Sequence, residues 1–156
     1  MNTLRSIITD PSAPALHQVC PDLTPEQVAG QEVWDLAQVM NWLMERTPHG
    51  AWGLAAPQVG SNLRVCLFRY ALRGEVQVAA NLHITRRWGE RKVEEECLSV
   101  PGGPRSGIRR SERVSATWLD LKGMRHSFRR ANGDFAQLLE HEHDHLEGVL
   151  YTEREI

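Results

Sequence analysis

The sequence has no long apolar run and few cysteines. None of its uncharged apolar stretches approaches the ~18 residues of a membrane-spanning helix, and no basic start leads into an apolar signal core. We therefore expect a soluble cytoplasmic protein without a membrane partner. The three cysteines, Cys20, Cys66 and Cys97, form an odd number without close spacing, which argues against a disulfide framework. The length predicts a single domain over residues 1–156.

Lysine is also scarce, since only Lys92 and Lys122 occur among the 18 basic residues. Arginine suits fixed contacts with carboxylates and phosphates better than lysine does. The net charge is −2, but residues 86–130 carry 12 basic against 6 acidic side chains. This basic stretch is compatible with a solvated, internally paired surface, a carboxylate-binding patch or a surface that faces RNA.

The apolar periodicity predicts an α+β fold in which antiparallel strands pack around a C-terminal helix, with a long N-terminal helix. Thr24, Pro25 and Gln27 favour a helix start, and one apolar face continues to Met44. The closing helix is expected over residues 135–150. The expected strands are residues 63–70, 76–80, 92–97, 113–120 and 124–130.

The closing helix carries the most informative motif, His-Glu-x-x-His. Glu142 and His145 fall on its apolar stripe, where burial of polar groups requires compensation. His141 and His145 are one helical turn apart, so both imidazoles can reach a single cation. Glu142 can reach a water on that cation and act as general base and then acid.

Two histidines need a third protein ligand. Tyr151 stands where a downstream third histidine of some metallopeptidases would fall, so the ligand is expected upstream. Cys97, at the end of a predicted strand, is the best candidate, and His126 is a weaker one. A thiolate and two imidazoles leave one tetrahedral position open, as catalytic sites require. Cys20 and Cys66 are expected in the core.

A third motif is the small-residue stretch 53–60. It lacks the ending of a phosphate loop and the spacing of a dinucleotide fingerprint, so we expect no nucleotide cofactor. Gln58 carries its only substantial polar side chain. The Gln58 amide could donate to a developing oxyanion.

Together, residues 53–60, 95–99 and 141–148 resemble the three motifs of peptide deformylases, Gly-x-Gly-Leu-Ala-Ala-x-Gln, Glu-Gly-Cys-Leu-Ser and Gln-His-Glu-x-Asp-His-Leu-x-Gly. The resemblance covers residues 4–151. It implies hydrolysis of the formyl group from N-formylmethionyl nascent peptides. It also implies one divalent metal ion, Fe²⁺ physiologically, with Zn²⁺, Ni²⁺ or Co²⁺ able to occupy the site.

The resemblance also assigns roles to residues. By it, Cys97, His141 and His145 are the metal ligands and Glu142 is the catalytic carboxylate. Gln58 and the Leu98 N–H stabilise the oxyanion.

It places Gly53 and the strand ending at Cys97 in the walls that hold the peptide, so Trp52, Gly53, Glu95 and Glu96 are expected to bind substrate. Asp144 is expected to pair with Arg109 behind the ligands, and His143 to be exposed.

The sequence departs from the family pattern at several positions. Trp52 would narrow the methionine pocket, Glu96 stands where the family has glycine, and Glu140 replaces glutamine. The chain stops at Ile156 without the C-terminal helix of many members, like short forms that resemble bacteriophage-encoded ones. The ribosome is a candidate partner through the basic stretch. The alternatives are a metal-dependent amidase or peptidase of altered specificity, a non-catalytic module that binds peptide N-termini, and an RNA-binding protein with a structural metal.

Overall fold

The structure is a computed structural model that describes residues 5–70 and 74–156. Its α-helices are α1 (Pro25–Val28), α2 (Gln31–Arg46) and α3 (Gly133–Leu146), and short 3₁₀ helices η1, η2 and η3 cover Pro14–His17, Ala56–Val59 and Tyr151–Arg154. The strands are β1 (Gly53–Ala55), β2 (Val65–Arg69), β3 (Val76–Trp88), β4 (Arg91–Cys97), β5 (Val100–Arg110), β6 (Arg113–Leu119) and β7 (Arg125–Asn132). This confirms the α+β class.

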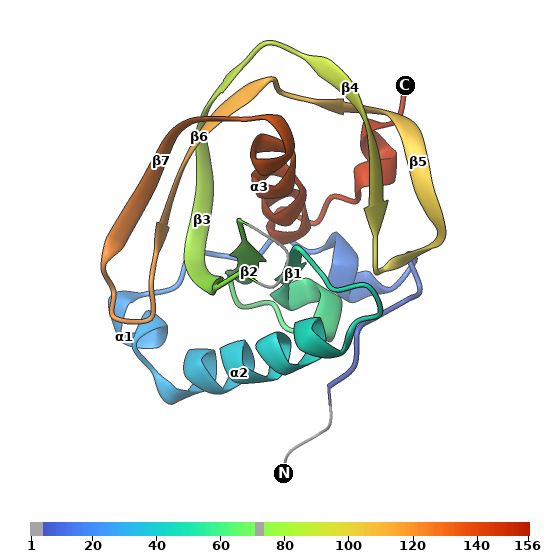
Figure 1. The fold of residues 1–156 in the computed structure, drawn as a ribbon. Coiled ribbons are helices and arrows are strands. Elements are labelled where there is room, and N and C mark those ends of the chain that lie inside the picture. Colours follow the sequence, from blue (N-terminus) through green and yellow to red (C-terminus); the bar gives the residue numbers. More distant parts are fainter. Residues whose placement is uncertain (1–4, 71–73) are drawn as a thin grey trace.

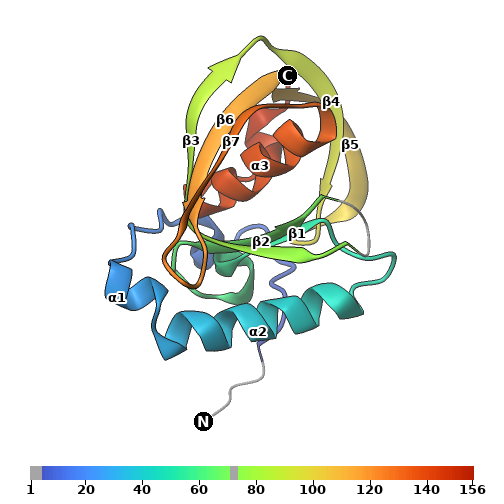
Figure 2. The same ribbon diagram turned by 60° about the vertical axis from the view of Figure 1, so that its left-hand side comes forward.

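The strands form two antiparallel sheets around α3 (Figure 1). One sheet has five strands in the order β1-β2-β3-β6-β7, and β4 and β5 pair separately. Figure 2 shows α3 enclosed between the strands, with α2 lying below β1 and β2. The central position of the helix that carries the His-Glu motif is therefore confirmed.

The expected long N-terminal helix is divided in two. Thr24 caps α1 through a reciprocal capping box with Gln27, as the sequence predicts. At Gly30, however, an added Cβ would lie 3.1 Å from the Glu26 carbonyl oxygen, and the chain there is extended before α2 begins. The apolar periodicity continues across this break, so periodicity alone did not reveal it.

Strand β5 is absent from the sequence prediction, which places no strand between residues 97 and 113. Most β5 side chains are exposed, so the strand lacks the apolar alternation that identifies a half-buried strand. Its pairing with β4 holds Cys97 opposite Val100. The hairpin thus fixes the end of β4, where the expected sulfur ligand lies.

Helix α3 ends at Leu146, four residues before the expected end at residue 150. Gly148 follows with φ of 73°, and a Cβ there would lie 2.7 Å from the His17 backbone. Leu150 and Tyr151 then pack under the β4–β5 hairpin with Leu16, Cys97 and Ile108. The N-terminal segment and the chain after α3 therefore pack on the same side of Cys97. None of the helices in the described residues is long and apolar enough to cross a membrane.

Candidate metal centre

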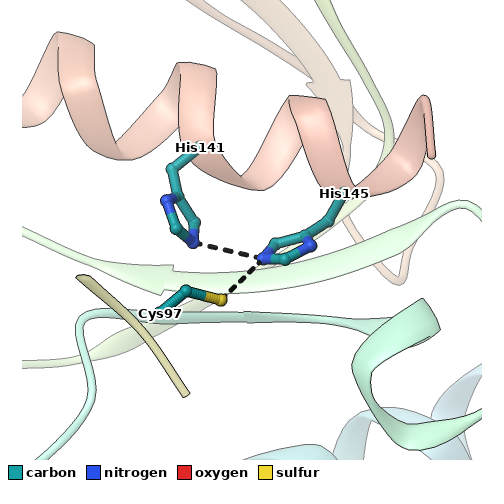
Figure 3. A group of neighbouring side chains, drawn as sticks. All are labelled: Cys97, His141 and His145. Carbon is teal, nitrogen blue, oxygen red and sulfur yellow. Dashed lines mark hydrogen bonds between the residues drawn. The ribbon is translucent and has the colours of Figure 1, made fainter. Parts of the chain in front are cut away.

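Helix α3 and the end of β4 bring three metal-ligating atoms together (Figure 3). The His145 Nε2 atom lies 3.3 Å from the Cys97 sulfur and 3.1 Å from the His141 Nε2 atom. All three ligand atoms lie within 4.8 Å of one another. His126, the weaker candidate, lies instead on β7, where its Nε2 atom is 2.8 Å from Asp120.

These separations fit a tetrahedral metal ion. Metal–nitrogen bonds of ~2.0–2.1 Å and a metal–sulfur bond of ~2.3 Å imply ligand–ligand edges of roughly 3.3–3.6 Å. The two short observed separations are close to these edges, so the residues fit a bound ion with little rearrangement. The donor set of one thiolate and two imidazoles suits zinc and iron.

The imidazole of His141 is oriented by Glu95. Its Nδ1 atom lies 2.5 Å from a Glu95 carboxylate oxygen, which can only accept, so Nδ1 donates and Nε2 faces the cluster. Burial would lower the pKa of His141, but the hydrogen bonds to Cys97 and Glu95 raise this pKa well above its usual value. Burial, together with the charge of His141, lowers the pKa of His145. In the metal-free cluster His141 therefore holds the additional proton that makes its imidazole positively charged.

Glu95 belongs to a buried ion network behind the ligands. The Arg110 guanidinium donates to both Glu95 oxygens, at 2.9 and 2.5 Å, and to Asp144 at 2.6 Å. Burial would raise the pKa of Glu95, but Arg110 and His141 hold this pKa at about 2. The Asp144 carboxylate also accepts from Arg154 at 2.9 Å.

The expected partner of Asp144 was wrong by one residue. Arg109 is exposed and pairs with Glu90 at 3.4 Å, whereas Arg110 is buried. Neighbouring side chains alternate across a strand, so only the register of β5 decides which arginine points inward. The Glu95 side chain, expected in the substrate wall, is likewise turned into this network and is 6% exposed.

Glu142 is nearly enclosed beside the cluster. It is 2% exposed, and its Oε2 atom has no hydrogen-bond partner among the described residues. Burial raises the pKa of this carboxyl to about 7. Gly53 provides the space for it, because a Cβ at that position would lie 2.8 Å from the Glu142 Cδ atom.

Gln58 is fixed with its amide toward the cluster. Its Oε1 atom accepts from the Ala55 N–H at 2.9 Å. Its Nε2 group donates to the Ser99 hydroxyl at 3.2 Å and lies 3.6 Å from the Cys97 sulfur. Leu98 lies between Cys97 and Ser99 in the turn that joins β4 and β5. Ser99, which is fully buried, was not identified from the sequence, because a serine beside a cysteine gives no signal before the fold is known.

The remaining expected residues lie nearer the surface. Trp52 is 48% exposed and Glu96 is exposed. His143 was expected to be exposed, but its side chain is only 13% exposed, and its Nε2 atom lies 3.6 Å from the Glu147 carboxylate at the end of α3. Tyr151, at the position of a third histidine, places its ring against His141 at a centroid distance of 6.1 Å.

Antiparallel strands wrapped around a helix that bears His-Glu-x-x-His, with a cysteine completing the ligand set, define a metal-dependent hydrolase. A sequence comparison identifies the family: residues 4–155 match the Polypeptide deformylase family. The chain belongs to this family, whose members remove N-formyl groups from nascent peptides.

Curated relatives agree with this assignment. A peptide deformylase of Dehalococcoides mccartyi is 42% identical over 119 residues, which cover 76% of this chain and 66% of the relative. A peptide deformylase of Chloroflexus aurantiacus is 34% identical over 88% of this chain and 77% of its own length. The chain thus spans about two thirds to three quarters of these relatives.

Solved structures show the same fold. The peptide deformylase of Legionella pneumophila superposes with a TM-score of 0.85 at 29% identity, over 97% of this chain and 86% of that one. A peptide deformylase of Acinetobacter baumannii with Met-Ala-Ser bound superposes with a TM-score of 0.84 at 27% identity, over 99% of both chains.

Proposed function

We propose that this protein hydrolyses the N-formyl group of N-formylmethionyl peptides and releases formate. The proposal rests on the enclosed Glu142 carboxylate beside the group formed by Cys97, His141 and His145. The Gln58 amide nitrogen lies 3.6 Å from the Cys97 sulfur of this group. We assign the three ligands one divalent ion, with Fe²⁺ as the physiological metal. When bound, it would act as a Lewis acid toward the formyl carbonyl and lower the pKa of water.

The chain's own residues supply proton transfer. Glu142 takes a proton from the attacking water as the new carbon–oxygen bond forms, and returns it to the leaving amine nitrogen as the carbon–nitrogen bond breaks. A carboxyl whose pKa lies near 7 can both accept and donate at neutral pH. The products are formate and a free peptide amine.

Two donors are assigned to the developing negative charge on the formyl oxygen. The Gln58 amide is held in place at both ends, by the Ala55 N–H on its oxygen and by Ser99 on its nitrogen. The Leu98 N–H follows the cysteine ligand directly in the chain. Preorganised donors of this kind are worth about 3–4 kcal/mol in the transition state.

The peptide is expected to bind as an added strand. Within the described sheets, β1 pairs only with β2 and β4 only with β5, so both strands have an unpaired edge beside the cluster. Edges of this kind bind extended peptides through backbone hydrogen bonds. Trp52, Gly53 and the backbone at Glu95 and Glu96 line the proposed groove. The Met-Ala-Ser complex of the Acinetobacter baumannii relative supports a short peptide as ligand.

Formylated chains arise during translation, so we place the activity in the bacterial cytoplasm, where the ribosome is the nearest partner. The basic stretch of residues 86–130 would favour contact with ribosomal RNA.

The test is formate release by metal-loaded protein from formyl-Met-Ala-Ser, compared with acetyl-Met-Ala-Ser and unblocked Met-Ala-Ser. We expect formate from the first peptide only. Glu142→Ala should keep the metal and lose several orders of magnitude in turnover, while Glu32→Ala, an exposed carboxylate on α2, should be unchanged.

Other outcomes would support the alternatives. Cleavage of the acetylated peptide would indicate an amidase retuned by Trp52 and Glu96. Peptide binding by metal-loaded protein without turnover would indicate a non-catalytic module.

A further inference from the structure

The outer face of β3, β6 and β7 is a basic surface that the proposed reaction does not use. Helix α3 packs against the inner face of these strands and leaves the other face outward (Figures 1 and 2). The three strands contain no acidic residue. They contain six arginines: Arg86, Arg87, Arg113, Arg125, Arg129 and Arg130.

The strand register gathers five of these arginines on one side, all except Arg87, which pairs with Glu140 of α3. On β6, Val114, Ala116 and Trp118 are buried toward α3, so Arg113 points outward. Trp88 of β3 lies opposite Arg113 and shares its face. By the same rule, Arg86 lies outward opposite Ser115, and Arg125 lies outward opposite Leu119.

A β-bulge adds two more arginines. The register shifts between Val114 and Ala116, so the β7 partners of these residues are Ala131 and Phe128. The Phe128 ring packs on Phe135 of α3 with a centroid distance of 4.8 Å, and Ala131 is buried. Arg129 and Arg130 therefore lie between two inward-facing residues. Both arginines are exposed.

Arg130 also has a left-handed backbone, with φ of 53°. Its N–H donates to the Ser115 hydroxyl at 3.1 Å, which fixes the bulge on the outer face.

The side chains form a platform. The guanidinium carbons of Arg86 and Arg130 lie 4.8 and 5.3 Å from the Trp88 ring centroid. In the described residues, Arg87 pairs with Glu140, but the other five arginines have no carboxylate within 4.0 Å. Arginines elsewhere on the surface, such as Arg105 and Arg109, have such partners. Among the described residues, these five arginines are therefore not held in ion pairs.

We propose that this arginine face, formed by Arg86, Trp88, Arg113, Arg125, Arg129 and Arg130, binds RNA. Guanidinium groups match phosphate oxygens with paired hydrogen bonds, and the guanidinium planes of Arg86 and Arg130 beside the Trp88 ring offer surfaces on which bases stack. Ser127 and Thr117, paired across β7 and β6 on the same outer side, add hydroxyls for sugar and phosphate contacts. RNA is favoured over an acidic protein because the face combines closely spaced arginines with an aromatic ring.

The test uses a fluorescein-labelled 20-nucleotide single-stranded RNA of mixed sequence and fluorescence anisotropy between 50 and 200 mM KCl. The variant Arg86→Gln/Arg113→Gln/Arg130→Gln should bind at least tenfold more weakly. Its salt dependence should fall by about 2 in log–log slope, since each lost phosphate contact removes about 0.7. The matched control Arg46→Gln/Arg105→Gln/Arg109→Gln removes the same charge from other exposed positions and should lose less than threefold. The variant Arg86→Lys/Arg113→Lys/Arg130→Lys keeps the charge but loses the planar guanidinium groups, so it should bind more weakly than the unaltered protein and more tightly than the glutamine triple.

Equal losses in both glutamine triples would overturn the proposal, as would RNA binding that is unchanged in the first triple. The proposal would also be overturned if the variant Arg86→Gln/Arg113→Gln/Arg130→Gln lost binding to phosphatidylglycerol vesicles but kept its RNA binding, because the face would then be a membrane-binding surface. All three triples should release formate from formyl-Met-Ala-Ser as the unaltered protein does, which reports on folding. RNA binding and formate release are separate measurements, so either can fail without the other.

Discussion

Burial of Glu142 should cost the metal-free protein stability, and Glu142→Gln should restore part of it. The pKa of this carboxyl rises from 4.5 to about 7 in the folded state. At about 1.4 kcal/mol per pH unit, that shift corresponds to a penalty of roughly 3 kcal/mol for keeping the carboxylate charged. The folded state binds the extra proton between these two values, so the stability declines as pH rises from about 4.5 to about 7 and is then level.

Glutamine removes the charge but brings an NH₂ group into a site without partners, which subtracts part of the gain. We expect Glu142→Gln to raise the free energy of unfolding by about 1–3 kcal/mol at pH 8 and by almost nothing at pH 4.5. Urea unfolding of metal-free protein at the two pH values measures this. For a chain of this size, each kcal/mol corresponds to about 2–4 °C in Tm.

A second buried carboxylate on α3 provides the control. Glu140 accepts from the Ser111 N–H and hydroxyl, each at 2.8 Å, and from Arg87 at 3.1 Å. Glu140→Gln should therefore lower the stability by about 1–3 kcal/mol at pH 8. If Glu142→Gln were no more stable than the unaltered protein at pH 8, the reasoning that Glu142 is an uncompensated buried charge would be refuted.

Three further predictions follow from the same geometry. Gly53→Ala should displace the Glu142 carboxylate and lower kcat for formyl-Met-Ala-Ser at least tenfold with metal retained; an unchanged kcat would show that the space is not needed. Arg110→Met removes the buried cation that Glu95 and Asp144 share and should lower the free energy of unfolding by about 3–5 kcal/mol, whereas Arg109→Met should cost less than about 1 kcal/mol in the same urea titration. Because His141 holds a proton in the metal-free cluster and must release it to bind an ion, affinity for Zn²⁺ should rise by about tenfold per pH unit below the pKa of His141; a chelator competition at pH 6, 7 and 8 that gave one affinity would contradict this.

The ligand set could be predicted because its signals are local. The separation of His141 and His145 fixes their common face on any helix, and the chain leaves few other residue types to complete the site. Cys97 and Gln58 could be proposed from the residues alone, as a cysteine at the end of a predicted strand and as the only substantial polar side chain of residues 53–60, and the family motifs then supported these roles. The structure brings all of these side chains together from segments about 40 residues apart.

The supporting residues could not be predicted in the same way. The choice between Arg109 and Arg110 depends on the register of β5, a strand whose exposed side chains hide its existence. Ser99, Glu95 and Gly53 take their roles from contacts between distant segments: with Gln58, with Arg110, and with the Glu142 carboxylate. None of these contacts has a periodic pattern in the sequence.

The two halves of the site have opposite electrostatics, and this difference explains how the fold can hold both. Behind His141, every charge is paired: Glu95 and Asp144 both bind Arg110, and the pKa of Glu95 is held at about 2. In front, the Glu142 carboxylate is buried without such a partner, and its pKa rises to about 7. A residue that must both accept and donate a proton near neutral pH cannot be tied to an arginine, because the ion pair would fix it as a carboxylate. The paired network keeps the imidazole in position, so that the unpaired carboxylate beside it can change protonation while the surrounding structure stays in place.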